Sequence, residues 1–222
     1  MRCVERGPAP HDEAGLPVDF AQYQDAAPYL KQRLGRYCSF CERVVRVSLA
    51  VEHKLPKRHH PDLERSWDNF LLACGNCNSM KGTQVAGVTE VLWPDSDDTF
   101  GALEYLESGR IQPRHAPAVN TEACAAATLR LVGLDRELFS SNTDHRWIDR
   151  LEVWSQAVAS REQVMANDTP ALRRLVTDSA AAIGGFSIWM EVFRDDPAMR
   201  QALCKRFPGT ALRSPDVPPN ID

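Results

Sequence analysis

Hydrophobic positions recur at helical spacing near the start of the chain and through most of its second half. Between Phe20 and Arg36 apolar residues fall three or four positions apart, and Pro28 is expected to break this stretch or to open its second helix. From Thr121 onward the pattern turns helical, and an amphipathic helix is expected over residues 143–166. The chain is therefore expected to be mainly helical.

Capping and turn signals delimit several of these elements. Thr169 and Asp196 each precede a proline, a pattern that predicts a capping side chain followed by Pro at the first helical position. Gly184-Gly185 separates two helical stretches. Residues 103–107 and 110–114 flank Ser108-Gly109 and are expected to form a small hairpin. The β-branched and apolar residues of 46–51 predict a short strand.

Composition places the chain among soluble globular proteins. Its 222 residues are 43% hydrophobic and 25% charged, which excludes global disorder, collagen-like repeats and a fibrous class. No run of eighteen apolar residues occurs, so no membrane span or membrane partner is expected. The first eight residues carry no apolar stretch behind their basic residues, so no secretory signal is predicted and a cytoplasmic location is expected.

Charge is distributed unevenly along the chain. The net charge is −4, yet residues 37–84 hold seven basic and five acidic residues, an excess of two positive charges. The rest of the chain is therefore acidic. Such a mild local bias is compatible with phosphate binding and does not by itself establish it.

Four of the seven cysteines form two pairs, Cys38/Cys41 and Cys74/Cys77, each with two residues between the sulfurs. This spacing lets one turn present both thiolates to a single ion, and two such knuckles complete a tetrahedral four-cysteine shell for structural zinc. Disulfides are not expected in a reducing compartment. Four buried free cysteines, or a cysteine-based redox protein, are the alternatives; a thioredoxin-like motif would need a βαβ context that the pattern lacks.

The 32 residues between the knuckles hold the remaining candidate chemistry. A strand, a second strand and a helix in this segment would bring Glu52, His53 and Asn78 around one small cavity. In this order Glu52-His53, Asn69, Cys77-Asn78 and Lys81 resemble the HNH endonucleases of the ββα-metal fold. More loosely, the wider chain resembles the HNH component of Septu-type and retron-associated bacterial anti-phage defence systems.

The resemblance implies a role for each of these residues. His53 would be the general base, because a neutral imidazole can take a proton near neutral pH. Glu52, where the family often has Asp, and Asn78 would hold a catalytic Mg²⁺ or Mn²⁺ through oxygen atoms. Adjacent strand residues point to opposite faces, so Glu52 and His53 can share a site only if the backbone bends. Asn69 would bridge the loop and orient the base.

Several further residues have competing interpretations. Lys57, Arg58 and Lys81 are candidate contacts to nucleic-acid phosphates, and a solvated charge is the alternative for each. His59 and His60 lie in a Pro-flanked loop and are expected to be exposed rather than to bind metal. Glu52 could be a solvated carboxylate, and Asn69 a turn residue that bonds its own backbone.

The expected fold is α+β, a small zinc-stabilised ββα unit embedded in a mainly helical protein. The expected segments are an N-terminal lead-in with helices (1–36), the HNH unit (37–84), a mixed connection (85–120), a helical region (121–207) and a flexible tail (208–222).

The expected function is metal-dependent cleavage of nucleic acid, most simply DNA, as the effector nuclease of a defence complex. The resemblance implies a companion ATPase similar to the SMC and ABC families, with the helices after residue 121 as its docking surface. Those helices could equally build only the protein's own core. The rival function is a non-catalytic zinc module that binds nucleic acid or protein.

Overall fold

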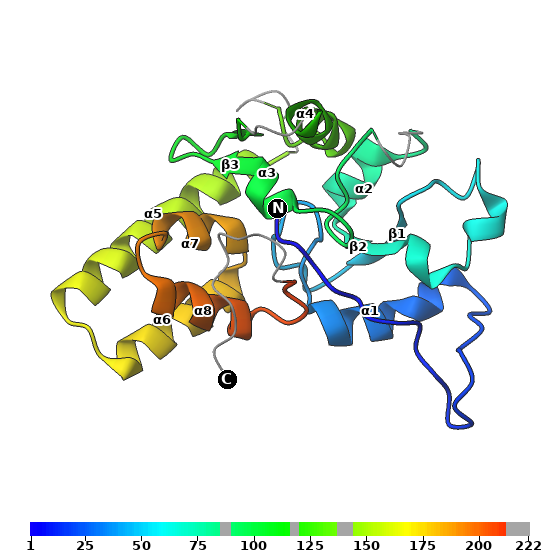
Figure 1. The fold of residues 1–222 in the computed structure, drawn as a ribbon, viewed down its shortest axis with the longest axis horizontal. Coiled ribbons are helices and arrows are strands. Elements are labelled where there is room, and N and C mark those ends of the chain that lie inside the picture. The colour runs from blue at the N-terminus through cyan, green and yellow to red at the C-terminus, as the bar shows by residue number, and fades with distance from the viewer. Residues whose placement is uncertain (85–89, 116–119, 137–143, 212–222) are drawn as a thin grey trace.

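The computed structural model describes residues 1–84, 90–115, 120–136 and 144–211. Small sheets and many helices form two sides of one molecule (Figure 1). On one side lie a short 3₁₀ helix η1 (Tyr23–Ala26), helix α1 (Ala27–Leu34) and the ββα unit. On the other lie helices α5 to α8, with α3, α4 and a second hairpin above and between the two sides.

The ββα unit is built from strands β1 (Ala50–His53) and β2 (Phe70–Ala73) and helix α2 (Gly75–Lys81). The strands are antiparallel, with Ala50 opposite Ala73 and His53 opposite Phe70. The connection between them holds two 3₁₀ turns, η2 (Pro61–Leu63) and η3 (Trp67–Asn69). The strand expected over 46–51 thus begins four residues later, because the chain turns at Ser48, whose φ is 62°.

The remaining elements follow their local signals. Helix α3 (Thr99–Ala102) leads into the hairpin of β3 (Leu103–Tyr105) and β4 (Ile111–Pro113), which confirms the hairpin expected around Ser108-Gly109. The helices of the second half are α4 (Thr121–Val132), α5 (Arg146–Ala166), α6 (Pro170–Ile183), α7 (Phe186–Val192) and α8 (Pro197–Arg206).

Local chemistry explains where these helices begin. The Thr169 hydroxyl accepts a hydrogen bond from the Leu172 amide, and the Asp196 carboxylate accepts one from the Met199 amide. Each cap precedes a proline, so both predicted helix starts are confirmed. Pro28 lies at the second position of α1 and opens that helix. No helix among the described residues is long and apolar enough to cross a membrane.

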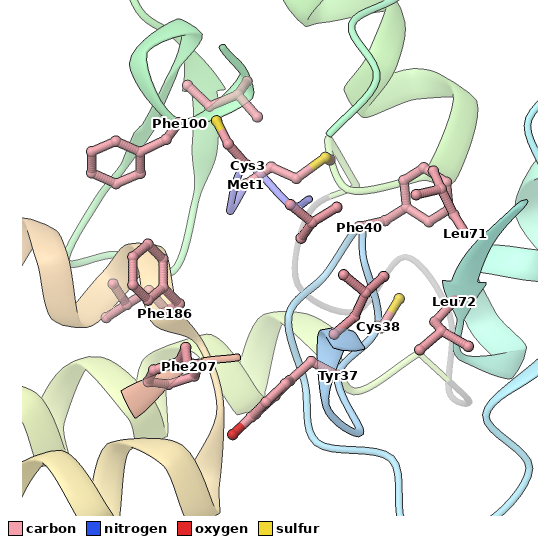
Figure 2. Close-up of a cluster of buried hydrophobic side chains, with 14 of the residues drawn as sticks. Met1, Cys3, Tyr37, Cys38, Phe40, Leu71, Leu72, Phe100, Phe186 and Phe207 are labelled. Atoms are coloured by element: carbon pink, nitrogen blue, oxygen red, sulfur yellow. The ribbon is translucent and has the colours of Figure 1, made fainter. Parts of the chain in front are cut away.

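One continuous hydrophobic core connects the zinc knuckles, the N-terminal segment and the helical region. Figure 2 shows Phe40 and Leu72 from the ββα side in the same cluster as Phe100, Phe186 and Phe207. All five side chains are buried. The ββα unit is therefore embedded in the protein, as expected, and the helical region forms part of its wall. The tail from residue 212 lies outside the described residues.

Candidate active site and zinc centre

The two cysteine pairs meet in one buried cluster. The four sulfur atoms of Cys38, Cys41, Cys74 and Cys77 lie within 4.8 Å of one another. The Cys41 and Cys74 sulfurs are 3.6 Å apart, close to the roughly 3.8 Å edge that a tetrahedral shell of zinc–sulfur bonds requires. The sulfur of Cys74 also caps helix α2, accepting from the Cys77 amide at 3.5 Å. A structural zinc ion fits this donor set.

Four neighbouring thiols cannot ionise independently. Hydrogen bonds from the other three thiols lower the pKa of Cys74, whereas burial raises the pKa of Cys41 and Cys77 well above the usual range. A divalent cation would allow all four to be thiolates. Arg146 contributes a further positive charge, because its guanidinium donates to the Cys77 sulfur at 3.1 Å.

Glu52 lies on β1 against helix α2. Its Oε1 atom is 3.0 Å from the Nζ atom of Lys81, and both side chains are buried. Burial raises the pKa of Glu52, while the ion pair with Lys81 opposes that rise. The Lys81 nitrogen makes no well-oriented hydrogen bond to any described residue. The ion pair is therefore closely packed, and the Lys81 ammonium lacks a well-oriented hydrogen-bond acceptor among the described residues.

The position of Lys81 differs from the surface location that its expected phosphate contact requires. Its side chain is 1% exposed, because the last turn of α2 packs it against β1. It faces Glu52, the residue expected to bind a metal. In this structure Lys81 can meet a phosphate only if the pair opens.

His53 stands at the end of β1 with its ring held on three sides. Its Nε2 atom is 2.8 Å from the carbonyl oxygen of Glu64. The rings of Tyr23 and Phe70 contact it edge-on, with centroids 4.7 and 5.4 Å away. A carbonyl can only accept, so Nε2 carries the hydrogen and Nδ1 of the neutral ring is left as the acceptor. Burial lowers the pKa of His53, partly opposed by the Glu64 hydrogen bond.

Asn69 ties together the loop between the two strands. Its Oδ1 atom accepts from the Leu55 amide at 2.8 Å, and its Nδ2 atom donates to the Leu55 carbonyl at 2.9 Å and to the Leu63 carbonyl at 3.3 Å. The Asn69 carbonyl in turn accepts from the Lys54 amide. This buried amide thus bridges the loop that carries Glu64, whose carbonyl holds His53.

Asn78 is half-buried on α2, three residues before Lys81. Residues three apart share a helix face, so Asn78 lies on the side of α2 that meets β1. Helix α2 begins three residues earlier than Asn78, because Cys74 caps it. Asn78 thus shares a face of α2 with Lys81, the residue that meets Glu52.

The loop after β1 carries the other candidate contacts. Lys57 is exposed and pairs with the Glu64 carboxylate at 2.8 Å, and Arg58 is exposed. His59 is exposed and His60 half-buried, and neither belongs to a cluster of possible metal ligands among the described residues.

Three residues that shape the site escape sequence reasoning. Tyr23 packs on His53 from η1, and Glu64 supplies its backbone carbonyl to the same ring. Arg146 reaches the four-cysteine cluster from α5, 69 positions along the chain from Cys77. Only the cysteine spacing carries a local signal; these contacts depend on the tertiary fold.

Comparison with known proteins agrees with this geometry. Residues 38–84 match the family model described as HNH endonuclease. The matched segment contains both cysteine pairs, β1, β2 and α2. The resemblance of this unit to HNH endonucleases is therefore confirmed.

The chain is also similar to the Septu protein PtuB of Bacillus thuringiensis. The two are 34% identical over 97 residues, which make up 39% of this chain and 38% of the relative. The chain thus spans less than half the length of this relative. The likeness confirms the Septu resemblance over that part.

Proposed function

We propose that this protein is a metal-dependent endonuclease that hydrolyses phosphodiester bonds of DNA and serves as the effector nuclease of a Septu-type anti-phage defence complex. The observation that carries the proposal is the arrangement of His53. Its Nε2 atom is bound to the Glu64 carbonyl and its pKa is lowered by burial, so a neutral ring offers Nδ1 as a base. The HNH family match and the relative named for Septu support the same activity and context.

Each residue has a defined task in this proposal. Nδ1 of His53 accepts the proton of the attacking water. Asn69 holds the loop whose Glu64 carbonyl fixes the imidazole ring. Glu52 and Asn78 supply oxygen atoms suited to Mg²⁺ or Mn²⁺, which would relieve the negative charge that develops on the leaving 3′ oxygen.

Lys81 has two successive binding partners in this proposal, the Glu52 carboxylate and a substrate phosphate. In the structure it neutralises Glu52 at 3.0 Å. When a cation takes over that carboxylate, the Lys81 ammonium is free to contact a substrate phosphate, which would also satisfy its buried nitrogen. Lys57 and Arg58, exposed on the neighbouring loop, contact phosphates further along the strand.

Cleavage of supercoiled plasmid by the purified protein tests the activity. We expect nicking with Mg²⁺ or Mn²⁺ and none with EDTA. His53→Ala should slow cleavage by about 10²- to 10⁴-fold, the usual contribution of a positioned base, with zinc content and melting preserved. His59→Ala, an exposed histidine six residues away, is the matched control and should cleave normally. If His53→Ala cuts as fast as the wild type, the proposed mechanism is wrong.

One observation favours the rival function of a non-catalytic zinc module. The ion pair between Glu52 and Lys81 already neutralises the carboxylate that the metal would need. A module without catalysis would keep that pair closed. Absence of cleavage with either metal, together with retained DNA binding, would select this function instead.

The proposed complex also includes a companion ATPase similar to the SMC and ABC families. The helical region exposes large apolar side chains that its own core does not use, Met165 on α5 at 72% and Leu175 on α6 at 61%. The double variant Met165→Asp/Leu175→Asp should co-purify less of an ATPase encoded by a neighbouring gene. Val47→Asp, an exposed apolar residue of the ββα side, is the control. Full co-purification of the folded double variant would overturn this docking surface.

A further inference from the structure

A groove beside His53 extends the site beyond the segment that matches the HNH family. It has a volume of about 320 Å³ and lies between residues 21–24, which include the start of η1, and the residues Lys57, Glu64 and Arg65. In Figure 1 this blue segment directly precedes α1 and lies beside the cyan loop between β1 and β2. One wall thus comes from outside the family-matched residues 38–84.

Tyr23 links this wall to His53. The two rings meet edge-on at an interplanar angle of 62°, while Phe70 supports the imidazole from another side at 79°. An imidazole held between two aromatic rings and a carbonyl cannot rotate freely. Tyr23 therefore fixes the direction in which Nδ1 points.

The same tyrosine contacts a cation of the groove. The ammonium of Lys57 lies 4.5 Å from the centre of the Tyr23 ring and 2.8 Å from a Glu64 carboxylate oxygen. Both partners of this ion pair are substantially exposed, so the pair contributes little to stability and a phosphate can displace Glu64 from Lys57.

Arg65 supplies the second cation at the groove. Its guanidinium donates to the Phe20 carbonyl at 3.1 Å, which fixes its position, and it remains 54% exposed. The carboxylate of Asp19, 3.5 Å away, is almost fully exposed and competes weakly. The groove thus presents two replaceable ion pairs next to the candidate base.

We propose that this groove is the subsite for the nucleic-acid backbone flanking the scissile phosphate, and that Tyr23 is a positioning residue for His53. Lys57 and Arg65 neutralise one phosphate each. The volume lies at the lower end of ligand sites, which suits a single nucleotide of one strand. The inference rests on the proposed nuclease function and names how that site holds its substrate.

Binding is measured without cleavage by placing each variant in full-length His53→Ala protein. The probe is a fluorescein-labelled 20-nucleotide DNA strand, followed by anisotropy over a series of salt concentrations. Lys57→Gln and Arg65→Gln should each weaken binding and lower the slope of log affinity against log salt by about 0.7, because each removes one phosphate contact. Arg161→Gln on α5, 42% exposed, makes the same charge change as the control and should leave the slope unaltered. Groove variants that bind like the control would overturn the subsite.

The role of Tyr23 is tested by turnover in the active protein. Tyr23→Ala should lower kcat by about three- to tenfold, the factor that loss of one aromatic pair implies. Tyr23→Phe keeps the ring contact and should restore kcat. Tyr29→Ala is the control, because Tyr29 is half-buried on α1 and contacts Phe20 instead of His53. A kcat for Tyr23→Ala equal to that of the control overturns the positioning role.

The outcomes separate this inference from the proposed function. Suppose that the wild type cleaves DNA, that His53→Ala does not, and that the groove variants behave like their controls. The groove is then not a substrate subsite, and the proposed nuclease activity is retained. If no protein cleaves DNA, the nuclease and the role of Tyr23 both fall, whether or not Lys57 and Arg65 bind the strand.

Discussion

Arg146 gives the sharpest test of how the four-cysteine cluster is joined to the rest of the molecule. Its side chain is 3% exposed and donates to the Cys77 sulfur at 3.1 Å. It also donates to the carbonyls of Val132 and Gly133, which end helix α4, at 2.7 and 2.9 Å. Two further contacts reach the carboxylate of Asp144. We expect Arg146→Ala to destabilise the protein strongly.

The size of the effect follows from the groups left behind. Removing one partner of a buried charged network typically costs about 3 to 5 kcal/mol, because the remaining groups stay buried without a partner. In Arg146→Ala these are a carboxylate, two helix-terminal carbonyls and a thiolate. For a chain of this length the melting temperature should fall by at least about 6 °C. Arg146→Lys should recover only part of this, because an ammonium lacks the planar fork.

Urea unfolding and zinc release to a chromophoric chelator measure the two consequences. Arg146→Ala should unfold at lower urea and lose zinc faster than the wild type. Arg161→Ala is the matched control, an arginine of the same helix whose ion pair with Asp195 spans 3.8 Å at the surface. It should change stability by less than about 1 kcal/mol. A change of about 1 kcal/mol shifts the melting temperature of such a chain by about 2 °C. If Arg146→Ala melts within about 2 °C of that control, the hydrogen bonds of Arg146 do not contribute the expected energy of about 3 to 5 kcal/mol.

Three shorter predictions concern the site itself. Cys38→Ser or Cys77→Ser should lose zinc and most of the cooperative transition, since structural zinc contributes on the order of 10 kcal/mol in small modules; full zinc content with unchanged melting would contradict the four-cysteine site. Lys81→Met leaves Glu52 buried alone and should lower the urea-unfolding free energy by about 3 kcal/mol at pH 7; a change below about 1 would disprove the pair's importance. Because burial lowers the pKa of His53, cleavage should rise with pH through a midpoint below 6.5 and then level; a midpoint above 7 would contradict this environment.

Signals confined to a few neighbouring residues predicted their elements well. Two residues between paired cysteines, a capping residue before proline and a Ser-Gly turn each restrict the local backbone directly. The structure agrees at Thr169, Asp196 and the hairpin of β3 and β4. The ordered HNH motif predicted the ββα unit for a different reason: its residues occur in the same order in a known family.

The sequence could not predict contacts whose partners are distant in the chain. A lysine in the last turn of a helix normally reaches solvent, and only the packing of α2 on β1 explains why Lys81 meets Glu52. The first strand was placed too early because a β-branched run shows propensity, whereas pairing with β2 decides which residues are strand. Nothing near Arg146 in the sequence indicates that it contacts a cysteine.

The helical region packs on the cysteine pairs with one face and exposes Met165 and Leu175 on another. The inner face contacts the residues that flank Cys38 and Cys41. The Ser187 amide and hydroxyl donate to the Glu42 carboxylate at 2.8 and 2.6 Å, and the Tyr37 hydroxyl donates to the Ala181 carbonyl at 2.8 Å. The apolar side chains buried on α6 and α7, among them Val176, Ala180 and Trp189, belong to this protein's own core. A partner held on the outer face, at Met165, would act on helices that share the zinc cluster's hydrogen bonds. Binding of such a partner would therefore be coupled to the integrity of the zinc unit through the same packed elements.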